Sequence, residues 1–103
     1  MGVRISGSTR FTGTAESDLF SVSGAYVAYL KRLSVTNEST ALATVTVRFY
    51  NGTVGKVVLT LSVAAGETVV LAESELPIEG CPTRITVSST QAPYSVDYSV
   101  ELE

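Results

Sequence analysis

The stretch from Ala41 to Glu73, ALATVTVRFYNGTVGKVVLTLSVAAGETVVLAE, carries the clearest pattern in the chain. Apolar and polar residues alternate from 43 to 50, as they do in a strand with one buried face. Asn51-Gly52 and Gly55 supply turn residues, and a second alternating run follows from 56 to 63. Gly66 marks the next turn, before a short run at 68–73. The stretch therefore predicts two long strands and a shorter third, joined by tight turns.

Strand patterns continue on both sides of this stretch. We expect strands at 18–24, 25–37, 83–88 and 95–102, separated by loops rich in Gly, Pro, Ser and Asn. In 25–37, Leu30 and Leu33 cannot share one face of a regular strand, and a bulge near Lys31-Arg32 would reconcile them. A short helix over 25–33 is the competing interpretation. In the loop at 74–82, Leu76 and Ile78 are expected to cover one end of the core.

The regular spacing of these strands and turns predicts an all-β protein. We expect an antiparallel β-sandwich of seven to eight strands with jelly-roll or Ig-like topology. We divide the chain into an N-terminal arm or edge strand, 1–18, and a sandwich domain, 19–103. The arm is rich in Gly, Ser and Thr and carries Phe11, which something must cover if the arm is ordered. The expected core residues are Phe20, Val22, Leu33, Val35, Val45, Val47, Phe49, Leu59, Leu61, Val63, Val69, Leu71, Ile85, Val87, Val96, Tyr98 and Val100.

Composition excludes several classes of function. The chain has 103 residues, a net charge of −3 and a pI near 4.8, and its seven Lys and Arg are scattered, so we expect no nucleic-acid partner. No apolar run approaches the roughly 20 residues of a membrane span. The N-terminal residues do not resemble a signal peptide, and we expect synthesis in a cytoplasm. Charged residues make up only 17% of the chain. The polar faces are therefore rich in hydroxyl groups, which cost little to bury against a partner.

No pattern in the sequence predicts catalysis or a cofactor. The chain has no His, which is the commonest general base, and no recognised catalytic motif, so we expect a non-enzyme. Its single cysteine, Cys81, has no partner for an internal disulfide. Glu73, Glu75 and Glu79 form the densest acidic group, and a solvated loop explains them better than a calcium site. The sequon residues Asn37 and Asn51 are interpreted as turn formers.

The candidate interaction surface is the outer face of the strands predicted between Ala41 and Glu73. If its apolar residues build the core, the other face is weakly charged and β-branched, and it would bury against a neighbouring subunit at little electrostatic cost. A plain solvated sheet is the alternative explanation. The candidate interface residues are Thr44, Thr46, Arg48, Tyr50, Val58, Thr60 and Phe11.

Three tyrosines, Tyr26, Tyr50 and Tyr94, fall outside the expected core positions. Aromatic residues with a polar tip are frequent at interfaces and on sugar-binding faces. If these rings lie together on one exposed face, they favour a carbohydrate-binding domain on a tail or cell-surface protein. This is the second functional hypothesis.

The run from Tyr29 to Ser88 resembles small virion proteins of tailed bacteriophages. The similarity lies in an aliphatic strand ending in Asn37-Glu38-Ser39, the ATVTV strand at 43–47, the Gly turn at 51–55, the VAAGET turn at 63–68 and the ELPIEG loop at 75–80. The N-terminal arm matches no motif of the family. The resemblance implies a capsid decoration or cement protein without catalytic residues, located in the virion. It also implies a homo-oligomer, with a trimer favoured, bound to the phage major capsid protein. A tail or neck component is the alternative within the virion.

Overall fold

The computed structural model describes residues 3–21, 28–51, 53–71 and 84–102. Every regular element among these residues is a strand, as the alternation predicts. The strands are β1 (Val3–Phe11), β2 (Ser17–Ser21), β3 (Ala28–Asn37), β4 (Ala43–Asn51), β5 (Val54–Val63), β6 (Thr68–Leu71), β7 (Arg84–Ser89) and β8 (Tyr94–Leu102).

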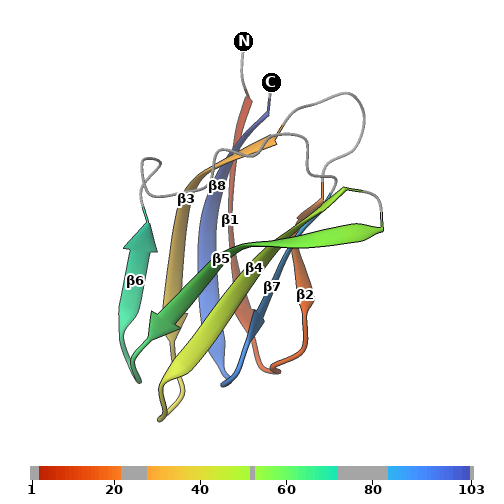
Figure 1. Cartoon of the computed structure of the whole chain (residues 1–103). Coiled ribbons are helices and arrows are strands. Elements are labelled where there is room, and N and C mark those ends of the chain that lie inside the picture. Colours follow the sequence, from red (N-terminus) through yellow and green to blue (C-terminus); the bar gives the residue numbers. More distant parts are fainter. Residues whose placement is uncertain (1–2, 22–27, 52, 72–83, 103) are drawn as a thin grey trace.

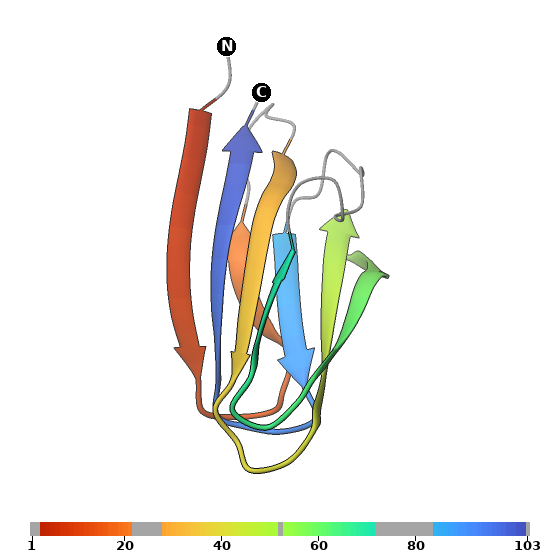
Figure 2. The ribbon, with the colours of Figure 1, turned by 90° about the vertical axis from the view of Figure 1, so that its left-hand side faces the viewer.

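The eight strands form two antiparallel sheets packed face to face (Figures 1 and 2). Sheet A has the order β1-β8-β3-β6, and sheet B has the order β2-β7-β4-β5. The chain changes sheet at most connections, and only β4 and β5 are consecutive strands paired in one sheet. This interleaving, with the first strand beside the last, is the jelly-roll arrangement. An Ig-like sandwich keeps its first two strands in one sheet, so that alternative is wrong.

Bulges in β2 and β3 change which side chains point inward, so apolar residues of opposite parity both contact the core. In β3 the register shifts between Leu30 and Arg32, at the predicted place, and both Leu30 and Leu33 are buried. The strand interpretation is therefore right for the described part of 25–33, and the helix alternative is wrong there. In β2 the register shifts between Asp18 and Phe20. Leu19 is consequently buried while Phe20 packs against the core from a half-exposed position.

Most of the expected core residues lie between the sheets. Ten are buried: Leu33, Val35, Val45, Val47, Phe49, Val63, Ile85, Val87, Val96 and Val100. Six lie on the margin, packed against the buried cluster but partly exposed: Phe20, Leu59, Leu61, Val69, Leu71 and Tyr98. Val22 lies outside the described residues, as do Leu76 and Ile78.

Tyr94 was expected outside the core and is instead one of its largest fully buried side chains. Strand β8 begins at this residue, directly after the β7–β8 loop, so the inward parity of Val96, Tyr98 and Val100 extends back to it. The Phe11 ring stacks on the Tyr94 ring, with centroids 5.0 Å apart and an interplanar angle of 24°. The aromatic pair closes one corner of the core.

Residues 3–11, in the segment expected to be an arm or edge strand, form edge strand β1. All nine of its residues pair with β8, from Val3 opposite Leu102 to Phe11 opposite Tyr94. Phe11 is half-buried and stacks on Tyr94, so part of its ring is committed to the core. The residue that covers the Phe11 ring is therefore Tyr94 of the same chain.

A third bulge lies in β5 and exchanges the roles of two valines. Leu59 is opposite Val47, but Val57 is opposite Arg48, so Val58 is the extra residue. Val58 packs against the core, while Val57 is 49% exposed on the outer side. The expectation that Val58 shares the outer face with Thr60 is therefore wrong, because a bulge reverses the alternation beyond it.

Candidate functional site

The outer face of sheet B brings most of the predicted interface residues together. Across β4 and β5, Thr44 is opposite Ser62, Thr46 opposite Thr60, Arg48 opposite Val57 and Tyr50 opposite Gly55. Paired residues of adjacent strands point to the same side, so these side chains form two parallel rows. On the other side of β4, strand β7 adds Arg84, Thr86 and Ser88 to the same face.

Tyr50 is held on three sides in the half of this face that lies near the β4–β5 turn; we call this the upper half, and the half that carries Thr44 and Ser62 the lower half. Its ring lies over Gly55, where an added Cβ would be 2.6 Å from ring carbons. The Arg84 guanidinium stacks on the ring with its central carbon 4.2 Å from the ring centroid. The phenol hydroxyl donates a 2.7 Å hydrogen bond to the Glu16 carboxylate. Tyr50 is therefore a fixed part of the sheet surface and not an open stacking platform.

Glu16 joins the β1–β2 connection to this face. Its carboxylate also accepts a hydrogen bond from the Thr86 hydroxyl, and Thr86 is almost fully buried beneath it. The hydrogen bond from Thr86, followed by that from Tyr50, lowers the pKa of Glu16 below its ordinary value, and the nearby charges of Arg48 and Arg84 act in the same direction. The same contact raises the pKa of the Tyr50 hydroxyl.

In the upper half of the face, the described positive and negative side chains are equal in number. Arg84 Nε lies 3.4 Å from a carboxylate oxygen of Asp18, and Arg48 donates a 3.3 Å hydrogen bond to the Ser88 hydroxyl. Two arginines therefore stand beside two carboxylates, those of Glu16 and Asp18. The lower half of the face, away from this group, presents the hydroxyls of Thr44, Thr46, Thr60 and Ser62, which are half-buried or exposed. The chemistry of this surface suits contact with another protein surface that is also weakly charged.

Sequence patterns did not identify Glu16, Arg84 or Thr86 as part of this face. Glu16 precedes β2 in a Gly- and Thr-rich segment, and Arg84 begins β7 far along the chain. Only the jelly-roll order, which places β7 between β2 and β4, brings them to Tyr50. Strand alternation alone does not predict which strands are neighbours.

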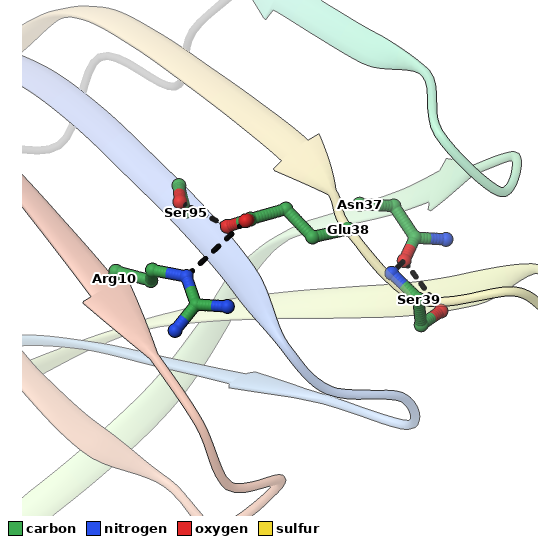
Figure 3. A network of polar contacts seen from close by, with 5 residues as sticks. All are labelled: Arg10, Asn37, Glu38, Ser39 and Ser95. Atoms are coloured by element: carbon green, nitrogen blue, oxygen red, sulfur yellow. Dashed lines mark hydrogen bonds and ion pairs between the residues drawn. The ribbon is translucent and has the colours of Figure 1, made fainter.

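A second polar cluster lies at the opposite end of the sandwich, where β3 runs into the β3–β4 loop (Figure 3). Fully buried Asn37 donates through Nδ2 to the carbonyls of Ala41 (2.7 Å) and Val63 (2.9 Å). Its Oδ1 accepts from the Ser39 backbone N–H (2.9 Å) and hydroxyl (2.6 Å). Asn37 therefore anchors the loop, in agreement with its prediction as a turn former.

Glu38 ties the same end of the sandwich to the first and last strands. Its carboxylate accepts hydrogen bonds from Arg10 Nε (3.2 Å) and from the Ser95 hydroxyl (2.5 Å), as Figure 3 shows. The Ser95 contact, and then that of Arg10, lowers the pKa of Glu38. Because each group of this cluster already has a partner within the fold, its role is structural.

Within the described residues, no group of His, Cys, Asp and Glu is arranged to hold a metal ion. The acidic residues Glu73, Glu75 and Glu79, and also Cys81 and Tyr26, lie outside the described residues. In the part of the chain that the structure covers, no helix is long and apolar enough to cross a membrane.

No protein-family model matches the chain, and no curated protein matches it in sequence. Solved structures do. One, described as "Bacillus endospore appendages form a novel family of disulfide-linked pili", has a TM-score of 0.55 and 17% identity over 98% of this chain and 85% of that chain. Another, "Structure of infectious bursal disease virus Gx strain", has a TM-score of 0.51 and 15% identity over 99% of this chain.

The similarity to these structures is a similarity of fold. This chain spans only 32% of the matched chain of infectious bursal disease virus. A third structure, "Crystal structure of PirA", matches with a TM-score of 0.46 and 14% identity over 100% of this chain and 92% of that chain. The β-sandwich is thus one that a pilus and a virus particle also contain, and sequence identity is too low for function to follow from it.

Proposed function

We propose that this chain is a non-enzymatic structural protein of a virus particle, and specifically a decoration or cement protein on the capsid of a tailed bacteriophage. The observation that supports this most directly is the outer face of sheet B. Its charges are balanced and its remaining groups are hydroxyls and Val57, so a protein surface can cover it with little desolvation cost.

The partner in this proposal is the phage major capsid protein, and the contact residues are Thr44, Thr46, Arg48, Tyr50 and Thr60, with Val57 in place of Val58. Similarity to a viral particle protein and to a pilus protein is consistent with an assembly role. A homo-oligomer is part of the proposal, and the resemblance to phage virion proteins favours a trimer. Phe11 is omitted from the contact because it packs against Tyr94.

The carbohydrate-binding hypothesis requires exposed tyrosine rings on one face, and the described residues do not provide them. Tyr94 is buried, and the Tyr50 ring lies between Gly55 and the Arg84 guanidinium. The two rings therefore do not form an exposed pair on which a sugar could stack.

The experiment has two steps. The genes beside the coding sequence are identified first, since adjacency to a major capsid gene supports the capsid assignment and adjacency to tail genes would instead favour a tail or neck component. The purified protein is then cosedimented with heads of that phage. We expect saturable binding that Thr46→Glu weakens and Ser8→Glu, on the outer face of sheet A, leaves unchanged. Absence of head binding by the unmodified protein would refute the proposal.

A further inference from the structure

We infer that the edge of β5 that no described strand covers pairs with β5 of a second copy of this chain, in antiparallel orientation about a twofold axis at Leu61. Sheet B would then continue through the axis as one eight-stranded sheet. The inference stands on the edge strand itself and does not rest on the proposed function.

The first observation is that β5 has one strand neighbour among the strands that the structure describes. Within the described residues it pairs with β4 alone and forms one edge of sheet B. An edge strand presents a row of backbone N–H and C=O groups to which another strand can pair. At ten residues, β5 is long for such an edge, and Figure 2 shows it in green at the right-hand side of the sandwich.

The second observation is that the only charged residue of β5, Lys56, lies in its first half, so the rest of this edge carries no charge. From Val57 to Gly66 the sequence VVLTLSVAAG contains no charged residue and no proline. The other long edge, β1, carries Arg4 and Arg10, and short β2 carries Asp18. The edge strand β6 has only four residues and directly follows Glu67. Natural proteins usually protect an exposed strand edge with charges, proline, bulges or short length. In β5 the bulge at Val58 and the charge of Lys56 both precede Leu59, so the stretch from Leu59 to Val63 contains none of these features.

The third observation is that the lower half of β5 is complementary to itself. Below the bulge at Val58, Leu59, Leu61 and Val63 point inward and Thr60 and Ser62 point outward. Antiparallel pairing about Leu61 sets Leu61 against its own copy, Leu59 against Val63 and Thr60 against Ser62. Apolar residues then meet apolar residues and hydroxyls meet hydroxyls, and no like charges are opposed. A twofold contact requires such self-complementarity, which is why a second copy fits this edge.

The partial burial of Leu59 and Leu61 is consistent with this arrangement. Leu59 and Leu61 face inward yet are only partly buried, because no strand continues the sheet beyond them among the described residues. A second β5 would cover the exposed parts of both leucines.

Charge reversal tests the pairing. The variant Thr60→Lys/Ser62→Lys opposes lysines across the axis, and Thr60→Glu/Ser62→Glu opposes carboxylates. We expect each variant alone to dissociate roughly tenfold more readily than the unmodified protein, and their equimolar mixture to recover the pairing as a mixed dimer. The matched control makes the same changes at Ser6 and Ser8, two exposed serines on the outer face of β1. Native mass spectrometry gives the readout, and circular dichroism verifies that each variant is folded.

Even-numbered assemblies are the expected result for the unmodified protein: a dimer, or a hexamer if a threefold contact also forms. A strict monomer or strict trimer overturns the β5 pairing, and so does a mixture of the charge variants that fails to associate. If the charge variants fail to fold, Leu61→Cys in a Cys81→Ser background replaces them, with rapid oxidation to a covalent dimer expected and absence of cross-linking contradicting the inference. Binding to phage heads is measured separately, so this inference and the proposed function can fail independently.

Discussion

The ring of Tyr50 on β4 covers the backbone of Gly55 on β5, and the two residues are directly opposite in the strand register. A Cβ at position 55 would lie 2.6 Å from two ring carbons. The ring cannot simply turn aside, because Arg84 stacks on it and Glu16 binds its hydroxyl. The absence of a side chain at Gly55 therefore decides where the tyrosine lies.

Gly55→Ala should accordingly destabilise the fold by about 1–3 kcal/mol, the usual range for overpacking. Gly13→Ala is the control, since a Cβ at position 13 meets nothing within 4 Å. Urea denaturation of both variants measures the difference. Equal stability of the two variants would show that the ring is not fixed by its neighbours.

Asn37→Ala should be more costly still, at about 2–4 kcal/mol, because it leaves the buried carbonyls of Ala41 and Val63 without their donor. Thr40→Ala, at an exposed position in the same loop, is the matched control and should change stability by less than about 0.5 kcal/mol. Thermal and urea denaturation both report the difference. A neutral Asn37→Ala would contradict the anchoring role of this residue.

Phe11→Ala tests whether β1 is an integral part of the sandwich. The ring is half-buried and stacks on Tyr94, so its removal should cost about 2–3 kcal/mol, somewhat less than a fully buried Phe. Leu42→Ala, at a side chain that is 63% exposed, should have little effect. Amide hydrogen exchange adds a second measurement. Rapid exchange along β1 in the unmodified protein would indicate a detachable arm.

Acid should weaken the fold through Glu16 and Glu38. Hydrogen bonds lower the pKa of each carboxyl in the folded protein below its ordinary value of 4.5. A group with a lower pKa in the folded state stabilises the fold above its unfolded pKa, and this stabilisation disappears as pH falls through the folded pKa. Stability should therefore decline as the pH falls below the ordinary value of these carboxyls, and Glu16→Gln and Glu38→Gln should each make the decline shallower.

The measurement is the urea midpoint at a series of pH values, with Glu67→Gln as the control. This exposed carboxylate has no side-chain partner among the contacts described above. If the Glu16 and Glu38 variants follow the same pH dependence as the unmodified protein, the hydrogen bonds to these two carboxylates do not contribute.

Alternation along single strands was sufficient to predict the fold class and most of the core, because each buried face is specified locally. The bulge in β3 was also predictable, since two leucines of opposite parity both required burial. The bulges in β2 and β5 were not, because Leu19-Phe20 and Val57-Val58 are apolar pairs and either member can face inward. Their placement depends on strand register, which the partner strands determine.

The candidate site was predictable only in part for the same reason. Thr44, Thr46, Arg48 and Tyr50 lie on one strand, and their common face follows from its period. The carboxylate that holds Tyr50 belongs to Glu16, 34 residues earlier in the chain. The guanidinium belongs to Arg84, on the later strand β7. Pairing between distant strands is a property of topology, and a local pattern does not contain it.

The pairing of Val3 with Leu102 also has a consequence for how the molecule forms. Sheet A has β8 between β1 and β3, so neither of these strands has its full set of partners until β8 has been made. On a ribosome, the β4–β5 hairpin can form as soon as it emerges, whereas β1 must wait until β8 has been made. Folding should therefore be slow for a domain of this size, because closing such long loops delays the transition state. During that interval an early β4–β5 hairpin would present the uncharged stretch from Val57 to Gly66 to other nascent copies.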